Sequence, residues 1–328
     1  MNIGIIGCGL IGKKRALNID PEDKITAVCD INKSSAKELG DLYKCKSFNN
    51  WKKLITDKSI EVVVVATTHN LLAEITLSAI KNGKHVLVEK PAARNADELE
   101  KVLKELKKKK VIVKVGFNHR FHPAMRKAKE IIDEGHIGNL MFVRGRYGHG
   151  GRVGYDKEWR AKPKISGGGE LLDQGMHLID LSRWYMGDFS KARGITKTYF
   201  WDMKVEDNAF MLLETKKKQV AQLHVSWTEW KNTFSLEIYG KTGKIAIDGL
   251  GKSYGTEKLT YYKMSKKMGP PETTVLEFPG EDTSWKDEWR DFKEAIKSGK
   301  EPCGNLKDAY EALKIVKEIY KENKNDYR

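Results

Sequence analysis

The chain has 328 residues, of which 40% are hydrophobic and 32% charged, and its formal net charge is +15. This length suffices for two domains with their own cores, and the balance excludes disordered and fibrous classes. The longest apolar runs, such as residues 62–66, are far shorter than the roughly 18 to 20 residues of a membrane-spanning helix. We therefore expect a globular protein without a membrane partner.

The N-terminus and the cysteines bear on location. An apolar segment, residues 3–11, precedes the basic residues at positions 13–15, which is the reverse of the order in a secretory signal. The four cysteines have neither metal-ligand spacing nor the density of a disulfide scaffold. A cytoplasmic location, reduced thiols and no bound metal are expected.

The positive charge raises the question of nucleic acid. Its densest cluster, Lys107 to Lys110, ends a helical pattern and lacks the interleaved aromatic residues of a single-strand platform. We expect a solvated lysine-rich surface and no nucleic-acid partner, although the charge could help to gather anionic substrates.

A glycine motif follows the first apolar run. Residues 7–12 read Gly7-Cys8-Gly9-Leu10-Ile11-Gly12, between a predicted strand and a predicted helix. In this context Gly7 permits a tight turn, Gly9 leaves room for a pyrophosphate, and Gly12 lets the helix pack close to the strand. The free N–H groups at the helix start, including those of Leu10 and Ile11, would bind the phosphates.

A carboxylate at the end of the second strand favours one cofactor. Asp30 follows the apolar run 25–29 and lies 18 positions after Gly12. It can accept hydrogen bonds from the adenosine ribose hydroxyls and would repel a 2′-phosphate, so NAD is favoured over NADP.

Strand-like and helical segments continue to alternate as far as residue 116, which predicts a doubly wound parallel sheet. Ligands bind such sheets beyond the carboxyl ends of the strands. That rule directs attention to Thr67, to Glu89-Lys90-Pro91 and to His119. Lys90 follows a strand directly, which makes a functional lysine more probable than a surface ion pair.

The pattern changes near residue 140. Alternating strands separated by short turns predict a large, mostly antiparallel sheet, and a final helical pair covers residues 285–298 and 306–323. The segment 166–181 places Asp173 and His177 four residues apart on an otherwise apolar helical background, after three glycines. We predict an NAD-binding Rossmann domain over residues 1–119 and an α/β domain with an open sheet over residues 120–328.

These motifs resemble those of the glucose-fructose oxidoreductase / inositol dehydrogenase / rhizopine catabolism (Gfo/Idh/MocA) family. The glycine motif, Glu89-Lys90-Pro91 and the block G-G-G-x-L-x-D-x-G-x-H-x-x-D at residues 167–180 occur in the family's order and at similar separations. The resemblance implies a Rossmann domain, a second domain whose open sheet face forms oligomer contacts, and chemistry at a secondary alcohol of a sugar, inositol or nucleotide sugar. A homodimer or homotetramer is therefore expected.

The resemblance also assigns catalytic roles. It implies that Lys90, Asp173 and His177 are the active-site lysine, carboxylate and histidine, and that Glu89 lies beside the cofactor. Oxidation of a ring alcohol needs a proton acceptor beside the hydroxyl, and a histidine or a lysine can serve. We favour His177 as the base with Lys90 polarising the hydroxyl, and the sequence leaves the choice open. The family's proline, asparagine and histidine after the fourth strand are replaced here, so Thr67 is the remaining candidate for nicotinamide contacts.

The loop 147–166 is rich in glycine, basic and aromatic residues, among them Arg152, Tyr155 and Arg160. Together with His119 these residues are candidates for substrate contacts, and they predict an anionic substrate; a solvated loop explains them equally well. The favoured function is an NAD-dependent dehydrogenase of sugar-type substrates. The alternatives are a glycosidase that recycles bound NAD and a non-catalytic NAD(P) sensor.

Overall fold

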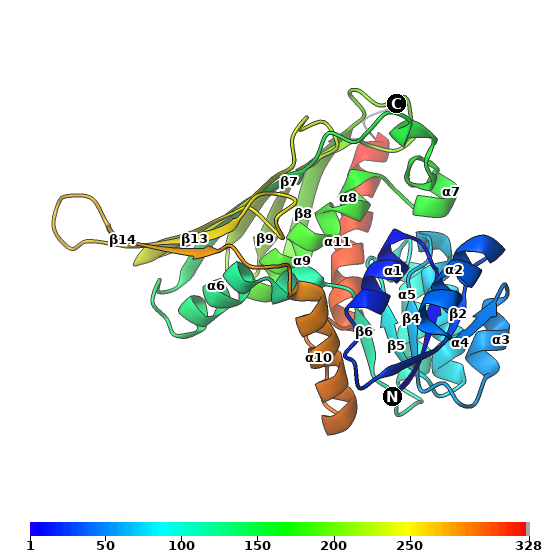
Figure 1. The fold of residues 1–328 in the computed structure, drawn as a ribbon. Coiled ribbons are helices and arrows are strands. Elements are labelled where there is room, and N and C mark those ends of the chain that lie inside the picture. Colours follow the sequence, from blue (N-terminus) through cyan, green and yellow to red (C-terminus); the bar gives the residue numbers. More distant parts are fainter. Residues whose placement is uncertain (326–328) are drawn as a thin grey trace. The chain divides into compact units, whose positions relative to one another are not determined.

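The structure is a computed structural model that describes residues 1–325. Its contacts divide the chain into two units. Of the described residues, the first contains 1–117, 164–167 and 285–310, and the second contains 118–163, 168–284 and 311–325. Each unit has its own sheet (Figure 1).

The first unit is built on a six-stranded parallel sheet in the order β3-β2-β1-β4-β5-β6. Helices α1 to α5 connect its strands, as in a doubly wound sheet (Figure 1). The elements are β1 (Asn2–Ile6), α1 (Leu10–Leu17), β2 (Lys24–Cys29), α2 (Lys33–Tyr43), β3 (Lys46–Phe48), α3 (Trp51–Thr56), β4 (Val62–Val65), α4 (His69–Lys81), β5 (His85–Val88), α5 (Ala96–Leu106) and β6 (Val113–Val115). The predicted parallel sheet is confirmed.

The burial of the central strand agrees with its place in a parallel sheet. All four valines of β4 are buried, as expected for a central parallel strand covered on both faces. Helix α10 (Ser284–Ser298) contributes to the same unit, because Trp289 and Phe292 pack in the hydrophobic cluster that holds residues of β1 and β2. The first unit therefore takes part of its core from a segment far along the chain.

The second unit carries an eight-stranded sheet in the order β14-β13-β12-β11-β7-β10-β9-β8. Its strands are β7 (Leu140–Gly148), β8 (Phe189–Lys197), β9 (Asn208–Thr215), β10 (Val220–Ser226), β11 (Thr233–Gly240), β12 (Gly243–Asp248), β13 (Glu257–Lys263) and β14 (Glu272–Phe278). Only β7 and β10 pair in parallel, so the predicted, mostly antiparallel sheet is confirmed. Strands β12 and β14 had not been predicted.

Helices of the second unit lie along its sheet (Figure 1). Helix α6 contacts β12 to β14, while α8 and α9 contact β7, β9 and β10. These helical segments are η1 (Asn118–Phe121), α6 (Pro123–Asp133), η2 (Tyr155–Lys157), η3 (Trp159–Ala161), α8 (Glu170–Asp173) and α9 (Gly175–Met186). Two further helices, α7 (Pro163–Ser166) and α11 (Leu306–Asn325), include residues of both units.

Among residues 1–325, no helix has the length and apolar character needed to cross a membrane.

Candidate active site

The glycine turn after β1 is built for close packing. Gly7 has φ +98°, and a Cβ atom there would lie 2.3 Å from the carbonyl oxygen of Ala66. A Cβ at Gly12 would lie 1.8 Å from the carbonyl oxygen of Gly7. Any side chain at Gly12 would therefore push α1 away from the end of β1.

The middle of the turn is open instead. No heavy atom lies within 4 Å of a Cβ built on Gly9, the N-cap residue of α1, and no side chain caps this helix end. Leu10, the first helical residue, is exposed. The first N–H groups of α1, among them those of Leu10 and Ile11, are thus at an open helix N-terminus, which suits a pyrophosphate. These residues fit a dinucleotide.

Asp30 joins the end of β2 to this turn. Its Oδ2 accepts a hydrogen bond of 2.7 Å from the Cys8 N–H, and its Oδ1 accepts one of 2.8 Å from the Asn32 N–H. Burial and the nearby Asp30 charge raise the pKa of the Cys8 thiol to about 12, so this thiol stays protonated at neutral pH. Asp30 therefore orders the glycine turn, and the ribose contact predicted for it remains a prediction.

The region after β4 departs from the expected pattern, as the sequence indicated. Thr67 is partly exposed at the carboxyl end of β4, and its Oγ1 donates to the Thr68 carbonyl oxygen over 3.3 Å. His69 starts α4 as a buried residue whose Nδ1 lies 2.8 Å from the Ser166 carbonyl oxygen. His69 is therefore a packing residue of the first unit, while Thr67 keeps an accessible side chain.

Lys90 lies on a turn anchored by buried charges. It follows Glu89 at the end of β5, and the Lys90–Pro91 peptide bond is cis. Arg15 of α1 donates through Nε to Glu89 Oε1 over 2.6 Å, and through Nη1 to Glu288 Oε2 over 2.5 Å. Burial raises the pKa of Glu288, an effect that the Arg15 charge opposes. The Arg15–Glu89–Glu288 network thus ties the helix after the glycine turn to the residue before Lys90.

Asp173 and His177 lie in the second unit, on two short helical segments. Asp173 ends α8, Gln174 follows, and His177 is the third residue of α9. The predicted single helix is therefore wrong in detail, because the His177 N–H bonds to the Gln174 carbonyl oxygen at 3.0 Å in a tighter turn. Both side chains are largely buried.

Asp173 meets a residue of the candidate substrate loop. Arg160 Nε lies 3.0 Å from Asp173 Oδ2. Arg152 in turn contacts Glu158 at 2.5 Å. Both predicted basic residues therefore already engage carboxylates of the second unit.

His119 stacks on His177. The ring centroids are 3.7 Å apart and the planes differ by 13°. His119 Nε2 lies 3.1 Å from the Tyr147 hydroxyl, and burial raises the pKa of Tyr147 well above its usual value, so this phenol stays neutral. The stacking fixes the plane of the His177 imidazole. His119 had been a candidate for substrate contact, which stays a prediction; its observed contacts are with His177 and Tyr147.

Tyr147 and the nearby Tyr254 had not been singled out from the sequence. Gln174 Nε2 donates to the Tyr254 hydroxyl over 3.0 Å, and the two tyrosine rings lie 5.1 Å apart. Neither tyrosine belongs to a motif: Tyr147 lies on β7 and Tyr254 lies in the connection between β12 and β13, and only the tertiary fold brings them near the Asp173 segment. Tyr155, which had been a substrate candidate, is only 3% exposed and packs edge-on against Trp227.

One acidic cluster has the spacing of a metal site. Ligand atoms of Asp20, Glu22 and Asp23 lie within 4.8 Å of one another. The Lys293 ammonium contacts all three carboxylates, with Nζ 2.9 Å from Asp20 and 3.0 Å from Asp23. The lysine is therefore the cation that this cluster binds in the structure.

Two family models match the chain. The model described as an oxidoreductase family with an NAD-binding Rossmann fold matches residues 1–117, and the GFO/IDH/MocA C-terminal domain model matches residues 125–246. The chain belongs to this family. The membership predicted from the motifs is confirmed, and residues 1–117 match the NAD-binding Rossmann fold of these oxidoreductases.

Several relatives have named activities. A levoglucosan dehydrogenase of Pseudarthrobacter phenanthrenivorans is 33% identical over 214 residues, 61% of this chain and 54% of the relative. An inositol 2-dehydrogenase of Salmonella typhimurium is 30% identical over 206 residues, 61% and 58% of the two chains. A myo-inositol 2-dehydrogenase of Thermotoga maritima is 26% identical over 328 residues, 95% and 93% of the two chains. The first two alignments thus span little more than half of each relative.

A solved structure extends the likeness to both units. A levoglucosan dehydrogenase in complex with NADH aligns with a TM-score of 0.91 and 25% identity, covering 99% of this chain and 97% of that chain. The NAD cofactor predicted from the sequence is confirmed, and its contacts at the glycine turn stay a prediction.

Proposed function

We propose that this protein is an NAD-dependent dehydrogenase that oxidises a secondary ring hydroxyl of a sugar, an inositol or a nucleotide sugar, or reduces the corresponding ketone. The named relatives act on levoglucosan and inositol, which supports a polyhydroxylated ring as substrate.

One observation within the first unit carries the proposal. The glycine turn follows β1 and Lys90 follows β5, so both lie at the carboxyl edge of the parallel sheet. Only β4 separates these strands, and two strand spacings amount to about 10 Å. A dinucleotide whose pyrophosphate binds at Gly9 could therefore extend along this edge toward Lys90.

The chemistry requires a hydride acceptor and a proton acceptor. Bound NAD would supply the hydride acceptor, which is its nicotinamide C4. His177 would take the proton of the substrate hydroxyl as the C–H hydride leaves, which gives ketone, NADH and one proton. The Lys90 ammonium would polarise the hydroxyl oxygen and favour loss of its proton, while Asp173 would orient substrate or imidazole.

The contacts of His177 support its role. Stacking on His119 limits rotation of the imidazole, and a base held in one plane can meet a hydroxyl without losing side-chain freedom during the reaction. This stacking explains why a histidine suits position 119.

The substrate's charge is a separate question. Arg152 and Arg160 contact Glu158 and Asp173, so an anionic substrate would have to compete with these carboxylates. We retain the anionic substrate as the prediction that a substrate panel decides. Equal activity on a neutral inositol and on its acidic counterparts would contradict it.

The experiment follows NADH absorbance while purified protein and NAD are offered free sugars, inositols, sugar phosphates and nucleotide sugars. Accumulation of NADH with one class, lost in Lys90→Ala and in His177→Ala, would support the dehydrogenase. Substrate turnover with no net NADH would indicate the recycling glycosidase. Tight NAD binding with no turnover at all would indicate the sensor.

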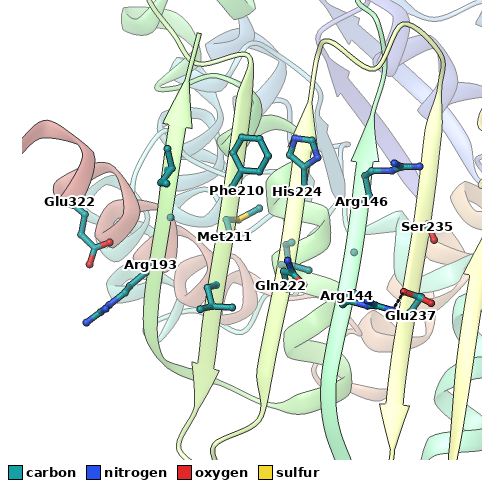
Figure 2. A pocket seen from close by; sticks show the side chains of 15 residues that line it. Arg144, Arg146, Arg193, Phe210, Met211, Gln222, His224, Ser235, Glu237 and Glu322 are labelled. Carbon is teal, nitrogen blue, oxygen red and sulfur yellow. Dashed lines mark ion pairs between the residues drawn. The ribbon is translucent and has the colours of Figure 1, made fainter. Parts of the chain in front are cut away.

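The open face of the second sheet supports a homo-oligomer. A hollow of about 860 Å³ lies on it, and its lining includes Ile195, Phe210 and Leu212, each exposed by more than 40% (Figure 2). Arg144 and Glu237 on the same face form an ion pair at 2.9 Å. An apolar patch rimmed by both signs of charge suits a second copy of the chain, and we propose a dimer or tetramer through this face.

Light scattering after size-exclusion chromatography tests the assembly. Phe210→Asp should shift the wild-type oligomer toward a smaller species, whereas Leu42→Asp, at an exposed apolar position on α2 of the first unit, should not. A monomeric wild type would contradict the proposed assembly.

A further inference from the structure

Glu206 is a buried carboxylate that precedes β9 and contacts the glycine segment before Asp173. Its Oε1 accepts hydrogen bonds from the Gly169 N–H at 3.1 Å and from the Leu171 N–H at 3.2 Å. Its backbone carbonyl oxygen accepts a further bond from the Glu170 N–H at 3.0 Å. The start of α8 has no cap from its own N-cap residue, so Glu206 supplies the acceptors that the first N–H groups of this helix need.

Tyr320 of α11 completes this contact. Its hydroxyl donates to Glu206 Oε1 over 2.6 Å, and within the second unit the Glu206 side chain is buried and Tyr320 is half-buried. The same oxygen thus receives three donors, two from the backbone and one from the phenol. Such a shared acceptor fixes the three donor groups relative to one another.

The glycines of the motif make this approach possible. A Cβ at Gly168 would lie 2.1 Å from the Tyr320 hydroxyl oxygen, and one at Gly169 would lie 2.0 Å from the Glu206 carbonyl oxygen. Gly167 is different, since its φ of +85° is the left-handed region that favours glycine. The second and third glycines are therefore needed for close packing against Glu206 and Tyr320.

The position of Asp173 depends on this segment. Helix α8 has only four residues, and the Leu172 and Asp173 N–H groups both bond to the Gly169 carbonyl oxygen, at 3.1 and 3.0 Å. A helix this short has little stability of its own, so its neighbours determine where it lies. Beyond Asp173, the Gln174 carbonyl oxygen accepts the His177 N–H, which links the same segment to α9.

We propose that Glu206 and Tyr320 are positioning residues that hold the α8–α9 segment so that Asp173 and His177 are aligned for hydroxyl oxidation. This inference rests on the proposed function of Asp173 and His177. Neither Glu206 nor Tyr320 belongs to the motifs that carry the family resemblance, and neither is expected to touch substrate. A small displacement of catalytic groups costs about ten- to hundredfold in rate, which sets the expected effect.

The test compares three variants with wild type. Tyr320→Phe removes one donor to Glu206 and keeps the ring, and Gly168→Ala places a methyl group against the Tyr320 hydroxyl. Asn323→Ala is the matched control, because Asn323 is a buried residue of the same helix whose amide bonds to the backbone of Gly194 and Thr196 on β8 instead.

We expect Tyr320→Phe to lower kcat about tenfold while KM for NAD stays within about twofold of wild type. Asn323→Ala should lower the melting temperature and leave kcat near the wild-type value. If Tyr320→Phe has a lower melting temperature, as Asn323→Ala does, but an unchanged kcat, Tyr320 only stabilises the fold. That result would overturn the inference. If Gly168→Ala does not fold, Tyr320→Phe decides alone.

A second readout separates this inference from the proposed function. With ¹³C-labelled histidine, the His177 Cε1–H signal, assigned through His177→Ala, reports the imidazole environment without any substrate. We expect it to shift in Tyr320→Phe and to stay in place in Asn323→Ala. Such a shift in a protein that oxidises no substrate would uphold the positioning contact and reject the dehydrogenase. An unshifted signal in Tyr320→Phe would reject the positioning contact even in an active enzyme.

Discussion

The two segments that carry the catalytic candidates are held in different ways. The turn of Lys90 in the first unit is anchored by opposite charges, since Arg15 contacts Glu89 and Glu288 in a buried network. The segment of Asp173 and His177 in the second unit is anchored by a single carboxylate, Glu206, that accepts backbone and hydroxyl donors. In the first case a buried arginine neutralises two carboxylates. In the second case uncharged hydrogen-bond donors surround one buried carboxyl.

This difference predicts different responses to mutation and to pH. A buried ion network loses much stability when one member is removed, because the remaining charges have no partner. A buried carboxyl surrounded by neutral donors responds to pH, because burial disfavours its ionised form.

Removal of Arg15 should give the largest effect. Arg15→Ala leaves Glu89 and Glu288 buried without their counter-ion, and we expect a loss of about 3 to 5 kcal/mol in the free energy of unfolding. Urea denaturation of the purified proteins measures it. The control is Lys37→Ala, which removes an exposed ion pair with Asp41 and should change stability by less than about 0.5 kcal/mol. Similar losses in both variants would contradict the charge network.

The Glu206 carboxyl should make stability depend on pH near neutrality. Burial raises its pKa to about 7, above the ordinary value of 4.5. The folded state then binds the proton more tightly, so the contribution is present below pH 4.5 and is lost as pH rises through 7. The pKa difference corresponds to about 3 kcal/mol.

Urea denaturation between pH 5 and 8 tests the sign. Wild type should lose stability as pH rises, and Glu206→Gln should flatten this slope. Glu214→Gln is the control, because the Lys218 and Lys191 contacts lower the pKa of this partly exposed carboxyl and its contribution is lost only as pH falls. A wild-type stability that increases from pH 5 to 8, with no change in Glu206→Gln, would contradict the assignment.

A pair of glycine variants sharpens the comparison within the first unit, and the Gly9 variant should give the smallest effect. Gly9 has φ −75° and open space around it, so Gly9→Ala should fold normally and raise the Kd for NAD about tenfold. Gly12→Ala should instead lose stability, because its Cβ would overlap the Gly7 carbonyl oxygen. Fluorescence titration with NAD and thermal unfolding separate the two effects. Unchanged NAD affinity in Gly9→Ala would place the pyrophosphate elsewhere.

The first unit was the more predictable part of the molecule, for a physical reason. Its central strands β1, β4 and β5 are largely apolar runs, and its glycine turn and Lys90 follow strand ends directly, so local sequence locates them. The network around Glu89 could not be foreseen, because Arg15 and Glu288 are 273 positions apart in the sequence. Nothing near either residue marks them as partners.

The second unit was predicted less completely. The sequence indicated the antiparallel sheet and the importance of Asp173 and His177, but not the break at Gln174 or the strands β12 and β14. The three glycines suggested a close approach of the chain to substrate. The structure instead shows two of them packed against Glu206 and Tyr320, which lie 37 or more positions further along the chain. Contacts between residues so far apart in the sequence leave no periodic pattern of residue types from which they could be predicted.

The central claim of the proposed function is that Lys90 and His177 take part in the same oxidation. Its most direct test is steady-state NADH formation by wild type, Lys90→Ala, His177→Ala and the double variant, with the best substrate of the panel. The account predicts a loss of at least about a hundredfold in kcat for each single variant. The double variant should lose far less than the product of the two, because both residues act on one hydroxyl. Wild-type kcat in either single variant would contradict the account.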